Sequence, residues 1–341
     1  MNSIYDGSKE KLENFFISKD EKKFKATITY EWLYKKRVNN FDDMINLSKK
    51  TINLLKENFK IEKLKLLTSL KGKDTFKFLF ELDDGNRIEA VLMHHDYGYS
   101  LCISTEVGCN MGCVFCESGR LKKVRNLAPS EMVLQIIQIE EIAKVRISHI
   151  VLMGIGEPFD NYDNVIEFIK IINDPKGINI GSRHITISTC GLIPKIKEFS
   201  HFDKQVNLAI SLHAPNNEIR NKLMPINKAY KIEELMETIK EYIKITNRRV
   251  TFEYIMLDSI NDSIDNALEL SKLLTGMNAY VNLIPYNETS NDIFKKSRKE
   301  QILKFYDTLK KNNINVTIRK EFGSNVNAAC GQLRANFKEE K

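Results

Sequence analysis

The residues with the clearest chemical potential are three cysteines in one short stretch of the chain. Cys109, Cys113 and Cys116 follow the spacing C-x3-C-x2-C, and Gly108 and Gly112 lie beside them. Three thiolates on one loop can bind one iron–sulfur cluster, and the two glycines allow the backbone to turn around it. Because a [4Fe–4S] cluster has four irons, one iron keeps an open position for another molecule. The spacing therefore predicts chemistry at a metal centre.

A zinc site is the main alternative for the same cysteines. Its fourth ligand would be His94, His95, Cys102 or a distant cysteine. Structural zinc sites generally use paired C-x2-C knuckles, and the chain has no second pair. A chance grouping of cysteines is a further alternative.

Length and composition indicate a protein with a large apolar core. The chain has 341 residues, of which 42% are hydrophobic, enough for one large domain with additions or for two domains. No apolar run approaches the roughly 20 residues that span a bilayer, and the first residues lack the apolar core of a signal peptide. We therefore expect a cytoplasmic location without membrane contact. There, the six cysteines are expected to be ligands or catalytic groups rather than structural disulfides.

Positive charge is concentrated at the N-terminal end. Residues 1–75 contain 17 Lys and Arg against 11 Asp and Glu, which accounts for +6 of the net charge of +7. An excess of this kind favours a polyanionic partner, and nucleic acid is the first candidate. A lysine-rich solvated surface is the alternative, because no compact basic motif is present.

The first 95 residues are predicted to form a helical module followed by strands. Apolar residues recur at helical spacing, and Asp42 and Asp43 lie near the start of the third helix, where the helix dipole favours acidic groups. The segments FKFLFEL and RIEAVLM flank Asp-Asp-Gly-Asn, which predicts a hairpin within residues 62–93. The predicted helices are 9–17, 27–37 and 42–58.

From about residue 100, predicted strands and helices alternate. Such repeats predict an α/β fold with a parallel sheet, and six units fit an open, partial (β/α)6 barrel rather than a closed eight-fold one. The predicted strands are 101–106, 147–153, 183–189, 205–212, 249–257 and 279–285. The predicted helices are 130–144, 161–172, 192–199, 231–245 and 262–275, followed by a helix at 297–312 and a strand at 314–319.

The strands of this predicted sheet alternate between apolar and polar residues. Ile185 and Ile187, for example, oppose Thr186 and Ser188. Helices should cover the apolar face, so the polar face should line a wet lumen that can bind a ligand. The cysteine loop follows the first strand and should lie at the C-terminal rim of the sheet, where ligand sites of such folds gather. Cys102 is the only cysteine on the lumen face of that first strand.

The cysteine loop is similar to that of the radical S-adenosylmethionine (radical SAM) superfamily, in which the open iron binds the amino and carboxylate groups of SAM. Further motifs resemble one branch, the RlmN/Cfr family of RNA adenosine methyltransferases, over nearly the whole chain. The segment AACGQL at 328–333 is the most discriminating of them. The other matching segments are 153–158, 187–189, 191–194, 211–213, 223–227, 253–257 and 282–287.

The resemblance implies a role for each matching residue. Cys330 accepts a methyl group from one SAM, and a second SAM yields a radical that activates this methyl for addition to an adenine carbon. Cys102 then forms a transient disulfide with Cys330 and releases the product, while Glu89 accepts a proton. The implied cluster ligands are Cys109, Cys113 and Cys116. The implied SAM contacts are Gly156, Glu157, Ser188, Ser211, Leu212, His213 and Asn287.

The same resemblance implies partners and a domain plan. The N-terminal segment becomes an accessory domain with salt-sensitive RNA contacts, and the target adenosine must be exposed or flipped out to react. The RNA is expected to be 23S rRNA and also tRNA, the reductant flavodoxin or ferredoxin, and the protein a monomer. The predicted domains are 1–60 (helical module), 61–95 (hairpin connection), 96–290 (barrel) and 291–341 (C-terminal extension with the carrier cysteine).

Two stretches depart from the family pattern, and two rival functions stay open. Residues 117–119 read Glu-Ser-Gly where Ala-Thr-Gly or Ala-Ser-Gly is usual, and Asn325 and Asn327 replace acidic residues before the last cysteine. Pro158 is typical of RlmN rather than Cfr members, so it favours methylation at C2 of adenine over methylation at C8. Cys190 matches no family role and is expected to be a buried core residue. The rivals are a radical SAM enzyme acting on tRNA or a peptide, and a non-catalytic zinc-stabilised RNA-binding protein.

Overall fold

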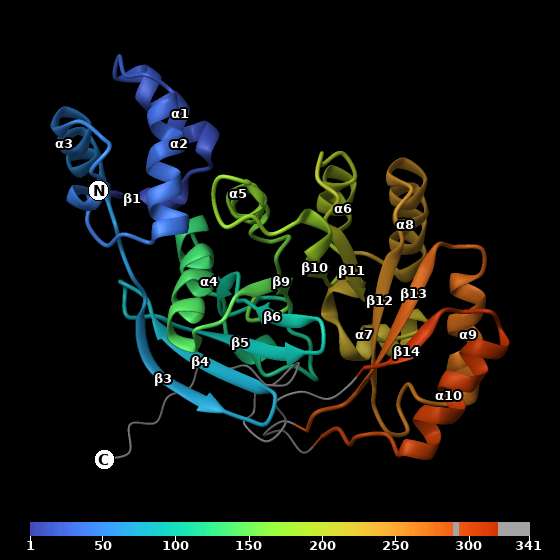
Figure 1. Cartoon of the computed structure of the whole chain (residues 1–341). Helices are drawn as coiled ribbons and strands as arrows, with labels where there is room; N and C mark the ends of the chain where they lie inside the picture. The colour runs from blue at the N-terminus through green and yellow to red at the C-terminus, as the bar shows by residue number, and fades with distance from the viewer. Residues whose placement is uncertain (289–292, 320–341) are drawn as a thin grey trace.

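The N-terminal helices form a small layer beside the main sheet (Figure 1). The computed structural model of the protein describes residues 1–288 and 293–319. Within the N-terminal layer, α1 (Lys9–Ser18) packs against α2 (Phe24–Glu31). Two short parallel strands, β1 (Asn2–Ser3) and β2 (Phe59–Lys60), pair with each other and bring the two ends of the layer together.

The third predicted helix, 42–58, is wrong in its first half. Residues Phe41–Asp43 form a 3₁₀ turn, and the α-helix α3 (Lys49–Asn58) begins only later. The Oγ of Ser48 accepts a hydrogen bond from the backbone N–H of Thr51 at 3.3 Å, which caps α3 at its N-terminus. The sequence periodicity continues across this break, so the cap and not the apolar pattern decides where the helix starts.

A ten-stranded sheet forms the body of the protein, in the order β14-β13-β12-β11-β10-β9-β6-β5-β4-β3. The strands from β14 to β6 are parallel, which confirms the predicted partial barrel, and the strand predicted at 314–319 is observed as β14 at the edge of the sheet. The parallel strands are β6 (Gly98–Cys102), β9 (Ile147–Leu152), β10 (Ile185–Thr189), β11 (Asn207–Ser211), β12 (Val250–Met256), β13 (Ala279–Pro285) and β14 (Val316–Ile318).

The hairpin connection is part of this same sheet. β3 (Lys65–Lys71), β4 (Thr75–Glu81) and β5 (Arg87–His95) are antiparallel, and β5 pairs with β6 at the first barrel strand. The predicted hairpin turn joins β4 to β5. The lumen wall therefore extends without interruption from the barrel onto the hairpin.

The first barrel strand lies earlier in the chain than predicted, because it runs from Gly98 to Cys102 and not from residue 101 to residue 106. Beyond it, the N–H groups of Thr105 and Glu106 donate to the carbonyl of Ile155, in the loop after β9. A two-residue strand, β7 (Glu106–Val107), then pairs with β8 (Arg125–Asn126). This pair closes the base of the segment that carries the three cysteines.

Helices connect the parallel strands and cover the outer face of the sheet (Figure 1). They are α4 (Pro129–Ala143), α5 (Tyr162–Asn173), α6 (Ile193–Phe199), α7 (Asn217–Leu223), α8 (Ile232–Thr246), α9 (Ile264–Leu274) and α10 (Lys299–Lys311). Six of these seven were predicted, and α7 was not. No helix in the described ranges has the length and apolar character needed to cross a membrane.

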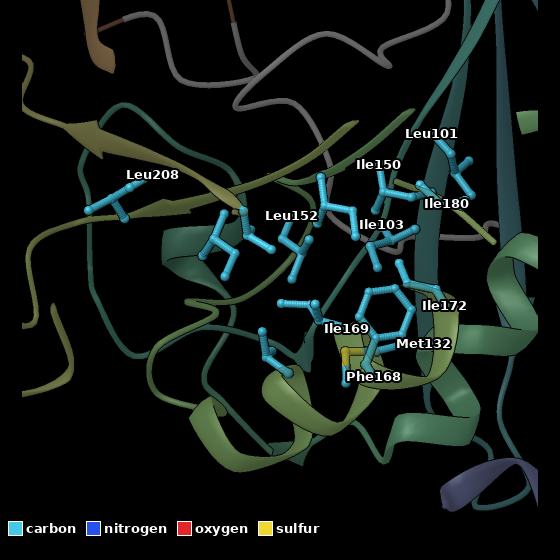
Figure 2. Close-up of a cluster of buried hydrophobic side chains, with 14 of the residues drawn as sticks. Leu101, Ile103, Met132, Ile150, Leu152, Phe168, Ile169, Ile172, Ile180 and Leu208 are labelled. Atoms are coloured by element: carbon cyan, nitrogen blue, oxygen red, sulfur yellow. The ribbon is translucent and has the colours of Figure 1, made fainter. Parts of the chain in front are cut away.

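The core lies between the sheet and these helices (Figure 2). Leu101, Ile150 and Leu152 from the sheet meet Met132 of α4 and Phe168 of α5, and all five side chains are fully buried. On the lumen side, β10, β11 and β12 present polar residues such as Thr186, Asn207 and Thr251, while β9 contributes the apolar Val151. This arrangement confirms the prediction of a polar lumen and explains how the fold presents chemical groups without breaking its core.

Candidate active site

The cysteine loop is held in shape by backbone contacts. The N–H of Cys109 donates to the carbonyl of Leu121 at 2.8 Å, and the N–H of Val114 donates to the carbonyl of Leu223 at the end of α7. Gly108 has a φ of +76°, and a Cβ there would lie 2.2 Å from the carbonyl oxygen of Lys122. Any side chain at this position would therefore force the loop open.

The three thiols are close enough to influence one another electrostatically. Burial raises the pKa of the Cys109 thiol to about 12, with smaller contributions from Glu106, Glu157 and the neighbouring Cys116. Burial also raises the pKa of the Cys113 thiol, with added contributions from Cys116 and Cys109. Three adjacent thiolates would repel each other in this setting, whereas a bound cation reverses that effect. The donor set therefore fits an iron–sulfur cluster, which supplies the positive charge.

Of the fourth ligands considered for a zinc site, His94, His95 and Cys102 do not lie at this loop, whereas the distant Cys190 lines the same cavity. His94 and His95 line a different cavity, and Cys102 lies in a separate apolar cluster. Among residues 1–288 and 293–319, no three His, Cys, Asp or Glu side chains converge as a site for a single metal ion. A cubane cluster binds each thiolate through a different iron, so it needs no such convergence.

Glu157 faces the cysteines from the loop after β9. Its carboxylate accepts hydrogen bonds from the backbone N–H groups of Cys190 (2.8 Å) and Phe159 (3.0 Å), and burial raises its pKa. The φ of Gly156 is +112°, and a Cβ there would lie 2.7 Å from the Glu106 side chain. Together these contacts hold one carboxylate at the wall of the cysteine cavity, where it can pair with an ammonium group.

Ser188 and Ser211 form the adjacent wall. They come from neighbouring strands, β10 and β11, and their Oγ atoms are 3.3 Å apart. Both side chains line the same cavity, of about 160 Å³, as the three cysteines and Glu157. Two hydroxyls in this position can donate to or accept from a ligand that lies across the strand ends.

His213 completes this wall in an uncommon backbone conformation, with a φ of +58°. Its Nδ1 accepts a hydrogen bond from the backbone N–H of Ile255 at 3.1 Å. Burial, together with the nearby guanidinium of Arg220, lowers the pKa of His213 to about 3. The ring is therefore neutral near pH 7, and because Nδ1 accepts, Nε2 carries the proton.

Two of the residues predicted to contact SAM, Leu212 and Asn287, do not line the cysteine cavity. Leu212 is fully buried in the core, and its backbone carbonyl accepts a hydrogen bond from Arg220. Asn287 follows β13 and is 8% exposed. Neither is among the residues that line the cysteine cavity in the described part of the chain.

Cys102 and Glu89 lie on one face of the sheet, next to this cavity. Cys102 pairs with Val91 across β5 and β6 and packs with Met93 in a small apolar cluster. Glu89 precedes Val91 by two residues in β5, so its side chain projects from the same face as those of Val91 and Cys102. The carboxylate of Glu89 is almost fully buried and is 2.8 Å from the Nζ of Lys77 on β4. No pattern in the sequence indicated this ion pair, because it depends on the register of the two strands.

The carrier Cys330 and the rest of AACGQL lie outside the described residues, as do Asn325 and Asn327. None of the five described cysteines forms a disulfide. The expected transient bond between Cys102 and Cys330 therefore stays a prediction.

Two residues near the cysteines were missed or undervalued by sequence reasoning. Arg220 of α7 is fully buried and donates to the carbonyls of Cys190 (2.6 Å) and Leu212 (3.2 Å) and to Oδ1 of Asn227 (3.0 Å). Cys190 is buried as expected, but it also lines the cavity, and its N–H holds Glu157. The only signal for Arg220 was its position between two matched motifs, in a segment without a predicted helix.

The fold and the site together define the radical SAM class. The Radical SAM superfamily model matches residues 103–271. A crystal structure of a radical SAM methyltransferase from Sphaerobacter thermophilus superposes with a TM-score of 0.92 at 37% identity, covering 98% of this chain and 100% of that one. Membership of the superfamily implies a [4Fe–4S] cluster and SAM.

The N-terminal module and the full-length relatives identify the family within the radical SAM superfamily. The ribosomal RNA large subunit methyltransferase N-terminal domain model matches residues 2–61. A probable dual-specificity RNA methyltransferase RlmN of Spiroplasma citri is 55% identical over 339 residues, 98% of both chains. The protein of the same description from Enterococcus faecalis is 54% identical over 349 residues, 99% of this chain and 98% of that one. The chain therefore belongs to the RlmN family of radical SAM methyltransferases.

Proposed function

We propose that this enzyme adds a methyl group to an adenine ring carbon of 23S rRNA, with C2 as the favoured position over C8. The observation that carries the proposal is the meeting of the three cysteines with Glu157 in one cavity, with Cys102 on the adjacent sheet face. Full-length similarity to RlmN proteins supports an RNA substrate. Pro158, which is buried and follows Glu157 in the chain, is typical of RlmN proteins and supports methylation at C2.

The same enzyme is proposed to act on tRNA as well. The relatives are described as dual-specificity RNA methyltransferases, and the N-terminal match concerns large-subunit ribosomal RNA. The basic N-terminal module suits a polyanion, whichever of the two RNAs carries the target.

In the proposed mechanism, the chain supplies ligands and a binding wall. Cys109, Cys113 and Cys116 would hold the cluster, which together with SAM and one electron would supply a carbon radical. Glu157 binds the ammonium of SAM, and the Nε2–H of His213 faces the ligand as a neutral donor. The remaining proposed SAM contacts are Gly156, Ser188, Ser211, Leu212 and Asn287. Two SAM molecules are used per turnover, one as methyl source and one as radical source.

Methyl transfer itself is proposed to run through the protein. Cys330 carries the methyl on its sulfur, and loss of one hydrogen atom lets this carbon bond to the adenine. Glu89 takes the proton displaced from that ring carbon, and Lys77 stabilises the Glu89 carboxylate for this role. Once the ring has returned its unpaired electron to the oxidised electron carrier, the thiolate of Cys102 attacks the Cys330 sulfur. The disulfide forms as the carbon–sulfur bond breaks, and the electron pair of that bond stays on the methylene carbon, which takes up a proton to become the methyl group. Reduction of the disulfide returns both thiols.

The proposal also concerns the enzyme's setting. We infer that it works as a monomer in the cytoplasm, where flavodoxin or ferredoxin supplies the electron for SAM cleavage. Thiol-based turnover through Cys102 and Cys330 fits a reducing compartment, because the disulfide must be reduced in each cycle.

The test is mass spectrometry of nucleosides after reaction of the anaerobically reconstituted enzyme with rRNA and tRNA from cells that lack the gene. We expect 2-methyladenosine with wild type, none with Cys330→Ala, and wild-type levels with the control Ser324→Ala in the same tail. Normal methylation by Cys330→Ala would show that the carrier role is wrong. Cys102→Ala should accumulate a covalent protein–RNA adduct, and its absence during turnover would remove Cys102 from the release step. A colourless protein that contains zinc and no iron would contradict the whole proposal.

A further inference from the structure

The lumen continues well beyond the cysteine cavity. A second cavity of about 1160 Å³ lies toward the N-terminal ends of the barrel strands. Met153, Glu253 and Arg319 line both cavities, so the two spaces adjoin at these residues. Pockets that bury a small ligand typically have volumes of about 300–1,000 Å³. The second cavity is therefore large enough for a ligand in addition to SAM.

The wall of this second cavity is polar along its depth. Thr186, Asn207, Thr251, Asn282 and Thr317 line it from five successive parallel strands. Their hydroxyl and amide groups can both donate and accept hydrogen bonds. A wall of neutral polar groups suits the edges of a nucleobase, which also present both donors and acceptors.

Two aromatic rings, His95 and Tyr97, line the cavity near the N-terminal ends of the strands, and His149 and His184 continue this group of rings beyond the lining residues. His95 and Tyr97, both on the cavity wall, stack with ring centroids 4.7 Å apart and an interplanar angle of 8°. Tyr97 meets His149 edge to face at 4.8 Å, and His149 stacks on His184 at 4.3 Å. We call these four residues the ring platform. Tyr97 is 62% exposed, so the platform presents ring surface to an incoming ligand.

Three arginines line the same end of the cavity, and we call this end the mouth. Arg183 precedes β10, and Arg248 and Arg249 precede β12. Their contacts are with neutral groups: Arg183 donates to Gln205 at 2.7 Å, Arg248 to a backbone carbonyl at 3.5 Å, and Arg249 lies over the Tyr280 ring. Among the described residues, none of the three forms an ion pair with a carboxylate.

Two carboxylates, Asp74 and Asp96, also line this part of the cavity. Three guanidiniums against two carboxylates leave the mouth with a net positive charge. Guanidiniums beside exposed rings are the groups that proteins use to bind single-stranded nucleic acid, by phosphate contacts and base stacking.

We propose that the mouth is where the RNA strand enters the enzyme. The ring platform stacks nucleotides next to the target, and the arginines contact their phosphates. The flipped adenosine then passes along the polar wall toward Met153 and the cysteine cavity. This inference rests on the proposed function, because it takes RNA as the substrate, and it assigns binding to a surface separate from the N-terminal module.

The test compares two mouth variants with matched controls in the full-length, cluster-loaded enzyme. One variant is Tyr97→Ala with His184→Ala, and its control is His201→Ala, an exposed histidine after α6. The probe is a fluorescein-labelled single-stranded RNA that spans the adenosine methylated by wild type, or oligoadenylate if wild type methylates none. Because stacking on an aromatic ring contributes substantially per base, we expect the ring variant to weaken RNA binding by about 10-fold or more in fluorescence anisotropy.

The second variant tests the charge of the mouth. Arg183→Gln with Arg249→Gln should lower the slope of log Kd against log salt concentration by about 0.7 for each phosphate that the protein no longer neutralises. Its control, Lys240→Gln with Lys244→Gln on the exposed side of α8, removes the same charge and should leave the slope unchanged. Release of 5′-deoxyadenosine without RNA should match wild type in all variants, which shows that the cysteine cavity is intact.

The outcomes separate this inference from the proposed function. If both mouth variants bind RNA and methylate it like their controls, the mouth is not the entry site, whatever the enzyme methylates. If wild type methylates no RNA but the mouth variants still lose affinity for the probe, the inference holds and the proposed function fails. If methylation and affinity fall together only in the mouth variants, both are supported.

Discussion

A neutral histidine buried at the candidate SAM site should make the protein sensitive to acid. The pKa of His213 is lowered from 6.5 to about 3 in the folded chain, because burial disfavours the charged ring. The unfolded chain binds a proton at this histidine below pH 6.5 and the folded chain does not. The stabilisation linked to His213 is therefore complete above pH 6.5 and is lost as the pH falls toward 3. At 1.36 kcal/mol per pH unit, the loss at pH 5 is about 2 kcal/mol.

Other buried groups act in the opposite direction over part of the same range. Burial raises the pKa of Glu106 to about 7 and also raises the pKa values of Glu157 and Glu253. A carboxyl whose folded pKa is raised favours the folded state as the pH falls from that pKa toward 4.5. The pH dependence of the wild-type protein alone therefore does not isolate His213, and a matched variant is needed.

His213→Asn is the appropriate variant. The Oδ1 of asparagine follows Cγ as the Nδ1 of histidine does, so it can accept the same hydrogen bond from the N–H of Ile255. Asparagine also tolerates the positive φ of +58° at this position. It does not titrate, and its smaller size leaves space beside Phe115, whose ring meets the His213 ring edge to face at 4.9 Å.

The assay is urea unfolding of the cluster-free protein, followed by circular dichroism at several pH values from 7.5 to 5. At pH 7.5 the variant should be the less stable protein, because of the cavity it creates. Between pH 7.5 and 5 the difference in unfolding free energy should shrink by about 2 kcal/mol, since only wild type loses stability through this ring. A difference that stays constant over this range would refute the assignment of His213 as a neutral, buried group.

Three further predictions concern stability, each measured by urea unfolding. Arg220→Lys should cost roughly 3 kcal/mol or more, since several buried oxygen acceptors lose their donors at about 1–3 kcal/mol each; a loss below about 1 kcal/mol would contradict this. Phe168→Ala should cost about 3–5 kcal/mol, whereas Ile142→Ala, at a residue that is 42% exposed, should cost far less; equal losses would be inconsistent with the core in Figure 2. Lys77→Met should cost about 3–5 kcal/mol because it removes the cation that lies 2.8 Å from the buried Glu89 carboxylate, and adding Glu89→Gln should recover part of the loss; no recovery would argue against a direct pairing.

Much of the fold was predictable because the pattern of apolar residues repeats along the chain. The strand predicted at 147–153 is observed at Ile147–Leu152, and that predicted at 279–285 is observed at Ala279–Pro285. The errors occur where local hydrogen bonds override that pattern. Ser48 starts a new helix inside a continuous periodic stretch, and from Thr105 onward the backbone bonds to Ile155 in the loop after β9 instead of continuing the strand.

The sequence by itself determined the class of chemistry. The spacing of Cys109, Cys113 and Cys116 is fixed by the order of residues along one short segment. Each of the short motifs that resemble the RlmN/Cfr family is likewise a run of neighbouring residues. These features can be recognised without knowing how the chain folds. For the same reason they could not show which distant groups meet the cysteines.

Only the tertiary structure decided which residues share a site. Strand register and helix packing determine three features of the site. They are the ion pair of Lys77 with Glu89, the hydrogen bond from the N–H of Cys190 to Glu157, and the burial of Arg220. The ring platform joins the β5–β6 turn to the starts of two other strands, a neighbourhood that exists only once the sheet is assembled. The physical reason is that parallel strands bring together residues far apart in sequence, at positions that no local spacing encodes.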